Sequence, residues 1–99
     1  MDRQSYVYIL FNKKNGTLYT GVTSDLIKRV YEHKNGMFPD SFTGKYDVNK
    51  LGYYEVFGDV KYAIEREKQI KSGSRRAKLE LIEKENANWQ DLYEEIAGA

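Results

Sequence analysis

Two tyrosine-bearing segments near the start of the chain carry residue types that could do chemistry. Residues 6–8 (Tyr-Val-Tyr) and 19–21 (Tyr-Thr-Gly) lie on either side of a turn, and the segment that follows contains Arg29. A carboxylate, Glu67, comes later in the chain. Phenols can orient or activate a water, an arginine can neutralise a phosphate, and a carboxylate can hold a hard cation. Together these side chains could cut a phosphodiester.

The two tyrosine segments are predicted to form a β-hairpin. Residues 6–11 and 17–22 are rich in β-branched and aromatic side chains, and the turn between them contains an Asn-Gly pair, residues 15–16. An even-length loop pairs even positions of the first strand with odd positions of the second, which places Tyr8 and Tyr19 on one face. An odd-length loop would separate them unless a bulge restored the phase.

A helix of about three turns is predicted after the hairpin, with Ser24 as its N-cap, Asp25 at its positive end and Asn35 with Gly36 as its stop. Arg29 and His33 are four residues apart and therefore project from the same flank. The expected buried stripe consists of Leu26, Ile27 and Val30.

Residues 37–49, which contain Pro39, read as an irregular loop, and residues 51–57 read as a third strand. A second helix is expected between residues 58–59 and 72–73. Glu67 falls within its apolar stripe, so helical geometry points this carboxylate toward the sheet, where it needs a cation or a donor. The expected inward positions are Val60, Ala63, Ile64 and Ile70.

A third helix is predicted from its cap at Ser74 to about Glu85, with Leu81 and Ile82 inward. Arg75 and Arg76 lie in its first turn, where cations oppose the helix dipole. With the free amides of that turn they would make a phosphate-binding corner, although exposed arginines are more often solvated surface.

The C-terminal segment is expected to form a short docked helix. Asn88 and Asp91 resemble a capping box. Four apolar residues then repeat at helical spacing: Trp89, Leu92, Tyr93 and Ile96. The whole chain is predicted to be one α+β domain, residues 1–99, with a core over about residues 5–85 and an acidic C-terminal helix over 86–99. A small three-stranded antiparallel sheet is flanked by helices in the order ββαβαα, followed by that short helix.

Charge is segregated along the chain. Residues 1–78 hold 15 of the 16 Lys and Arg residues and 9 of the 15 Asp and Glu residues, a net +6, whereas residues 79–99 carry a net −5. The basic part could meet a phosphate backbone, but the same pattern occurs where two helices pair their surfaces. The chain has no cysteine and one histidine, so any metal is expected to be bound by oxygen. No apolar run is long enough for a membrane span, and a soluble cytoplasmic protein is expected.

With these placements, the chain resembles the GIY-YIG nuclease superfamily, in particular small single-domain bacterial proteins similar to the N-terminal nuclease domain of excinuclease C. Residues 6–8 stand at the GIY element and residues 19–21 at the YIG element. Residues 25–29 carry the helix arginine, and residues 63–71 carry the glutamate segment. The resemblance covers nearly the whole chain, and the ordered set of motifs is specific although each motif alone is weak. Tyr6 stands where the family name calls for glycine.

The resemblance implies hydrolysis of DNA phosphodiester bonds assisted by one divalent cation, Mg²⁺ or Mn²⁺. Glu67 would be the metal ligand and Arg29 would neutralise developing charge. Tyr8 and Tyr19 would jointly activate and orient the water, with His33, one helical turn after Arg29, as the competing base. The residues expected to contact substrate are Gly21, Lys28, Arg75, Arg76, Lys78 and Asn86, with Asn88 as an alternative to Asn86 for the asparagine that closes the site.

No DNA-recognition domain accompanies the expected fold. This favours a structure-selective substrate such as branched, damaged or single-stranded DNA, in repair or recombination, or a protein partner that supplies targeting. A second hypothesis is a nucleic-acid-binding accessory module with poor turnover. A third is a protein-interaction domain that works through the C-terminal apolar stripe. Glu67 could also be one half of a structural ion pair with Arg29.

Overall fold

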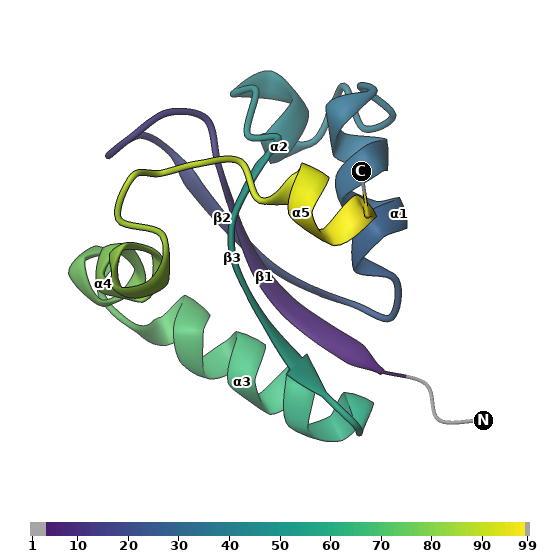
Figure 1. Cartoon of the computed structure of the whole chain (residues 1–99), viewed down its shortest axis with the longest axis vertical. Coiled ribbons are helices and arrows are strands. Elements are labelled where there is room, and N and C mark those ends of the chain that lie inside the picture. The colour runs from purple at the N-terminus through teal and green to yellow at the C-terminus, as the bar shows by residue number, and fades with distance from the viewer. Residues whose placement is uncertain (1–3, 99) are drawn as a thin grey trace.

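The computed structural model describes residues 4–98. Its centre is a three-stranded antiparallel sheet with the strand order β2-β1-β3, formed by β1 (Ser5–Phe11), β2 (Leu18–Thr23) and β3 (Lys50–Phe57) (Figure 1). Both pairings are antiparallel, and a register shift between Ile9 and Leu10 interrupts the β1–β3 ladder. The predicted α+β architecture is confirmed.

Within residues 4–98, five helices surround this sheet: α1 (Leu26–Lys34), α2 (Phe42–Lys45), α3 (Val60–Ser72), α4 (Arg75–Glu85) and α5 (Tyr93–Ala97). Helices α3 and α4 cover one face of the sheet, and α1 and α5 cover the other (Figure 1). The element order is the predicted one with α2 added. No helix within residues 4–98 is long and apolar enough to cross a membrane.

The central strand β1 supplies side chains to two separate hydrophobic clusters, because successive residues of a strand point to opposite faces. Val7, Ile9 and Phe11 pack beneath α3 and α4, whereas Tyr8 and Leu10 pack toward α1. All five side chains are almost fully buried. Burial of each large apolar side chain stabilises the fold by roughly 1.5–3 kcal/mol, so the side chains of β1 contribute to the stability of both helical layers.

The helix starts are set by side-chain caps, and one differs from the prediction. Asp25, rather than Ser24, caps α1, because its Oδ1 accepts a hydrogen bond of 3.1 Å from the backbone N–H of Lys28. Ser74 caps α4 as predicted, by accepting from the backbone N–H of Ala77 at 3.0 Å. Ser and Asp are both good N-cap residues, so side-chain chemistry alone does not decide between Ser24 and the adjacent Asp25.

Three predicted inward positions are wrong. Ile27 on α1, and Val60 and Ile64 on α3, have 44, 54 and 39% of their surface exposed. The contact stripes are narrower than the apolar patterns suggested: Leu26 and Val30 on α1, and Ala63 and Ile70 on α3, are the buried ones. A sheet of only three strands offers too little surface to cover a wide helix face.

The expected irregular loop over residues 37–49 contains the short helix α2, which is a second correction. Ser41 caps it, with its Oγ accepting from the backbone N–H of Gly44 at 3.2 Å and donating to the carbonyl of Phe38 at 2.6 Å. A Ser cap within a polar stretch is a short-range signal that a single helical turn can use.

The C-terminal segment covers the free edge of β3. The backbone N–H of Leu92 donates to the carbonyl of Leu51 at 2.8 Å, and Oδ1 of Asp91 accepts from the backbone N–H of Leu51 at 3.0 Å. Trp89 is not part of the helical stripe: it has a φ of 54° and packs edge-on against Phe11, on the face opposite α5. The predicted docked helix is confirmed, but it begins at Tyr93, so the predicted start near the Asn88 cap is wrong.

Candidate active site

The hairpin register brings the two candidate tyrosines onto one face of the sheet. Tyr8 pairs with Gly21, and Leu10 pairs with Tyr19, so even positions of β1 oppose odd positions of β2 as an even-length loop requires. The ring centroids of Tyr8 and Tyr19 are 6.4 Å apart. The predicted shared face is confirmed.

Gly21 makes room for the ring of Tyr8. A Cβ built on Gly21 would lie 2.5 Å from both Cζ and Oη of Tyr8, a separation that side chains cannot adopt. The phenol therefore crosses directly over the β2 backbone toward the edge of the sheet. Gly21 was expected to permit a close approach, and the group that approaches is Tyr8.

The hydroxyl of Tyr8 is buried and has no hydrogen-bond partner among the described residues. Burial raises the pKa of Tyr8 to about 12, and the neighbouring Tyr19 and Glu67 add to the increase while the nearby guanidinium of Arg29 opposes it. The side chains of Tyr19, Arg29 and Glu67 are thus all close enough to Tyr8 to influence its ionisation. A buried polar atom without a partner costs stability and marks a position where an additional group could bind.

Arg29 and His33 project from one flank of α1, as predicted. The Arg29 side chain is 40% exposed, and its Nε lies 3.6 Å from Oε1 of Glu32. Nδ1 of His33 is 3.0 Å from the hydroxyl of Thr43. Burial, reinforced by the positive charge of Arg29, lowers the pKa of His33 below its ordinary value of 6.5. His33 is therefore neutral at pH 7 and able to accept a proton.

Glu67 lies between the buried residues Ala63 and Ile70 on α3, and only 13% of its side chain is exposed. The prediction that it points toward the sheet is confirmed. Its partner is Lys71, whose Nζ lies 2.8 Å from Oε2 of Glu67 and 6.0 Å from the ring centre of Tyr19. The predicted alternative of an ion pair with Arg29 is wrong: within residues 4–98, the one ion pair that Glu67 forms is with Lys71.

Sequence reasoning missed Lys71 as a member of this group. Because it follows Glu67 by four residues, the spacing that favours ion pairs on a helix could have identified it. The hydrogen bond from Lys71 to Glu67 is the main cause of a raised pKa for Lys71.

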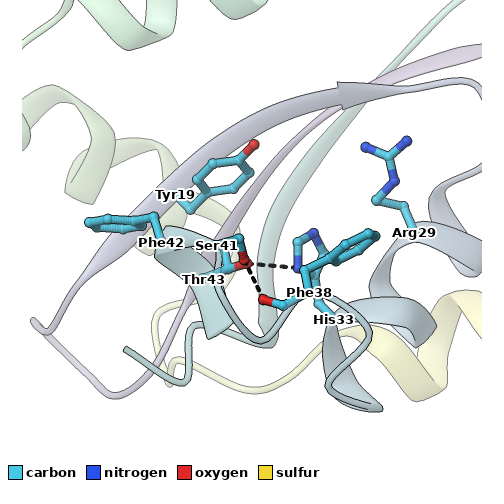
Figure 2. A pocket seen from close by; sticks show the side chains of 7 residues that line it. All are labelled: Tyr19, Arg29, His33, Phe38, Ser41, Phe42 and Thr43. Atoms are coloured by element: carbon cyan, nitrogen blue, oxygen red, sulfur yellow. Dashed lines mark hydrogen bonds between the residues drawn. The ribbon is translucent and has the colours of Figure 1, made fainter. Parts of the chain in front are cut away.

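A pocket of about 210 Å³ opens beside this cluster (Figure 2). Residues from β2, α1 and the segment around α2 line it: Tyr19, Arg29, His33, Phe38, Ser41, Phe42 and Thr43. In Figure 2 the Tyr19 hydroxyl and the Arg29 guanidinium extend toward the same side of the pocket. Sequence reasoning assigned no functional role to Phe38, Ser41, Phe42 and Thr43, because their positions depend on how residues 36–49 fold back onto α1.

Some residues predicted to contact substrate are engaged within the fold. The guanidinium of Arg75 donates to the carbonyls of Asn15 and Gly16 in the hairpin turn, at 2.8 and 2.6 Å. Lys78 donates to the carbonyls of Lys71 and Gly73 at the end of α3. Lys28 and Arg76 are exposed.

Asn86 is also engaged. Its side chain is buried, donates to the carbonyls of Gly52 and Gln90 at 3.3 and 2.8 Å, and accepts from the backbone N–H of Gln90 at 3.0 Å. Asn88, the alternative, is exposed. These bonds hold the segment after α4 against the sheet.

A family model described as the GIY-YIG catalytic domain matches residues 4–80. The chain belongs to the GIY-YIG family. A UPF0213 protein of Clostridium perfringens is 39% identical over 93% of this chain and 97% of its own length. A UPF0213 protein of Staphylococcus saprophyticus is 40% identical over 83% of this chain and 96% of its own length.

The solution NMR structure of a UPF0213 protein from Bacillus halodurans is 28% identical, superposes with a TM-score of 0.55, and covers 92% of this chain and 95% of its own chain. Membership of the GIY-YIG family makes this a nuclease-type domain with a nucleic-acid substrate. The matched region contains Tyr8, Tyr19, Arg29, His33 and Glu67.

A divalent cation fits the donor set of this GIY-YIG site. No group of three or more His, Cys, Asp or Glu side chains gathers anywhere in residues 4–98, so an all-protein cage is absent from this part of the chain. Mg²⁺ needs only one or two carboxylates when water and substrate phosphate supply the other ligands. Glu67 offers such a carboxylate, and the unpartnered hydroxyl of Tyr8 is near enough for Glu67 to influence its pKa.

Proposed function

We propose that this chain is an endonuclease that hydrolyses DNA phosphodiester bonds with one divalent cation, Mg²⁺ or Mn²⁺. The observation that carries the proposal is that Arg29 and Glu67, from two different helices, both lie near enough to the buried hydroxyl of Tyr8 to influence its pKa. A fold that needed only stability would gain nothing from a buried phenol without a hydrogen-bond partner, because such a group costs free energy.

Glu67 is the metal ligand in this proposal. When bound, the cation would stabilise negative charge on the phosphate and on the leaving oxygen. Lys71 must then release the carboxylate, and its side chain can move because half of it is exposed. Arg29 would bind a phosphate oxygen from the opposite side, and its permanent charge and forked donors suit a phosphate.

His33 is the best-placed proton acceptor. At neutral pH its imidazole is uncharged, because burial and Arg29 lower its pKa, whereas the raised pKa of Tyr8 keeps that phenol protonated. Tyr8 therefore serves as a hydrogen-bond donor that orients water or phosphate. Tyr19, whose ring centroid is 6.1 Å from that of His33, would help to orient the water beside His33.

A nicking assay on supercoiled plasmid and on branched DNA, with Mg²⁺ or Mn²⁺, tests the proposal. Wild-type protein should cut, a chelator should abolish cutting, and Glu67→Gln should remove activity. Arg29→Gln should lower the rate by about 10²–10³-fold, as expected when one donor to a developing anion is lost.

The matched control is Glu65→Gln, an exposed carboxylate two residues from Glu67 on the same helix, which should cut normally. Activity that survives Glu67→Gln would overturn the mechanism. Salt-sensitive DNA binding without any cleavage, unaffected by both site substitutions, would instead indicate a nucleic-acid-binding accessory module.

A further inference from the structure

The pocket beside Arg29 has aromatic walls. Phe38 lies against His33 with ring centroids 5.0 Å apart and an interplanar angle of 58°, and Tyr19 lies on the other side of the imidazole (Figure 2). At about 210 Å³, the pocket is smaller than the ~300–1,000 Å³ of sites for drug-sized ligands. It has room for one flat ring system rather than for a whole nucleotide.

Phe42 forms the outer wall of this pocket, although 48% of its surface is exposed. It packs against Tyr46, which is 54% exposed, with ring centroids 5.0 Å apart. Two large aromatic side chains side by side on one exposed helical turn add little to the core. An exposed aromatic pair of this kind at the rim of a pocket is typical of a binding surface.

Hydrogen bonds hold this aromatic wall in place. The Thr43 hydroxyl lies 3.0 Å from Nδ1 of His33 and 2.9 Å from the Ser41 hydroxyl, so α2 is tied to α1 through the pocket floor. The wall is therefore organised in advance of any ligand, which lowers the entropy cost of binding.

Positive charge lies at both ends of the wall. Arg29 lines the inner pocket, and Phe42 also lines a second, open pocket of about 510 Å³ whose other residues include Arg75 and Lys78. Along the protein surface, the aromatic wall therefore lies between two positively charged regions. A single-stranded nucleic acid has the complementary pattern, because each flat base is flanked by a phosphate on either side.

We propose that the pocket formed by Tyr19, His33, Phe38 and Phe42 binds one unstacked nucleobase of a DNA strand, with the adjoining phosphate at Arg29. The inference deepens the proposed function and rests on it for the identity of the polymer. A base inside a duplex is stacked and paired and cannot enter a side pocket. The preferred substrate therefore has an unpaired nucleotide at the site of cleavage.

Binding is tested in the Glu67→Gln background without metal, so that cleavage plays no part. The probe is a short oligodeoxythymidylate with one central 2-aminopurine, compared with the same strand in a duplex. Phe42→Ala and Phe38→Ala should each weaken single-strand binding by about 5- to 150-fold, the equivalent of ~1–3 kcal/mol for one lost base stack. Both should also relieve the quenching of 2-aminopurine fluorescence and leave duplex binding unchanged.

Two controls keep the test specific. Tyr31→Ala removes an aromatic residue that lies on α1, as His33 does, and is 53% exposed, but that does not line the pocket. This variant should bind the single strand as the Glu67→Gln parent does. Phe42→Trp keeps a stacking surface and should restore both affinity and quenching, which a merely structural role would not predict.

Equal losses on single strand and duplex, or no loss with either phenylalanine variant, would overturn the nucleobase pocket. That failure is separable from failure of the proposed function. If wild-type protein cuts DNA but the phenylalanine variants do not weaken single-strand binding selectively, only the nucleobase pocket is overturned. If the variants do weaken single-strand binding selectively but the wild-type protein never cuts DNA, the nucleobase pocket stands and the nuclease function is overturned.

Discussion

Nζ of Lys71 lies 2.8 Å from Oε2 of Glu67, one helical turn away on α3. The ammonium thus neutralises the carboxylate that is proposed to hold a divalent cation, and the two cations compete for one ligand. The lysine is half exposed and the carboxylate is mostly covered, so the lysine is the partner that can leave.

We predict that Lys71→Met strengthens divalent-cation binding about twofold, because an i,i+4 pair of this exposure is worth about 0.3–0.5 kcal/mol. Mn²⁺ binding followed by electron paramagnetic resonance measures this without relying on activity. Lys68→Met, which removes an exposed lysine from the same helix, is the matched control and should leave affinity unchanged. Weaker binding in Lys71→Met would mean that the lysine assists the site.

Tyr8→Phe should separate stability from activity. It removes a buried hydroxyl that has no hydrogen-bond partner in the described chain, so the free energy of unfolding should rise by about 1–3 kcal/mol while cleavage is lost. Urea denaturation and the nicking assay measure the two effects.

Tyr53→Phe is the contrasting variant. The Tyr53 hydroxyl donates to Glu55, which also pairs with Arg66. Loss of this bonded hydroxyl should destabilise the fold. If Tyr8→Phe also destabilises the fold, the Tyr8 hydroxyl has a hydrogen-bond partner in solution.

His33 should titrate below its ordinary pKa, and activity should follow it. Because burial and Arg29 lower its pKa, the imidazole is neutral above that pKa and charged below it, so the cleavage rate should fall as the pH drops through a value under 6.5. As the chain has one histidine, its proton NMR signal can be followed without ambiguity.

Arg29→Gln should raise the His33 pKa, since it removes one of the two causes of the decrease. In His33→Ala the acid limb of the pH–rate profile should disappear along with most of the activity. An acid limb that persists unchanged in this variant would assign proton transfer to another group.

The segment after α4 should be required for folding. Trp89→Ala should destabilise the protein by about 3–5 kcal/mol, because it empties a buried site against Phe11, whereas Asn88→Ala, at an exposed position, should have little effect. Deletion of residues 86–99 should cause unfolding or aggregation, since it bares the edge of β3 at Leu51.

Circular dichroism measures the loss of stability in Trp89→Ala and the unfolding of the deletion variant, and sedimentation measures aggregation. A deletion variant that stays folded and binds DNA more tightly would show that the acidic segment shields the basic surface instead.

The sequence by itself determined the features that depend on local periodicity. Strand alternation and an even-length loop placed Tyr8 and Tyr19 on one face, and the 3.6-residue repeat turned Glu67 inward. These relations hold for any fold that contains the same hairpin and helix, because they follow from backbone geometry alone.

Only the tertiary structure decided which groups meet. It kept Arg29 out of an ion pair with Glu67, left 39% of the Ile64 surface exposed, and placed Phe42 in the wall of the pocket beside Arg29. Contacts of this kind depend on how far each helix is shifted and rotated against a sheet of three strands. The pattern of one segment carries no information about that placement, because it arises from packing between segments distant in the chain.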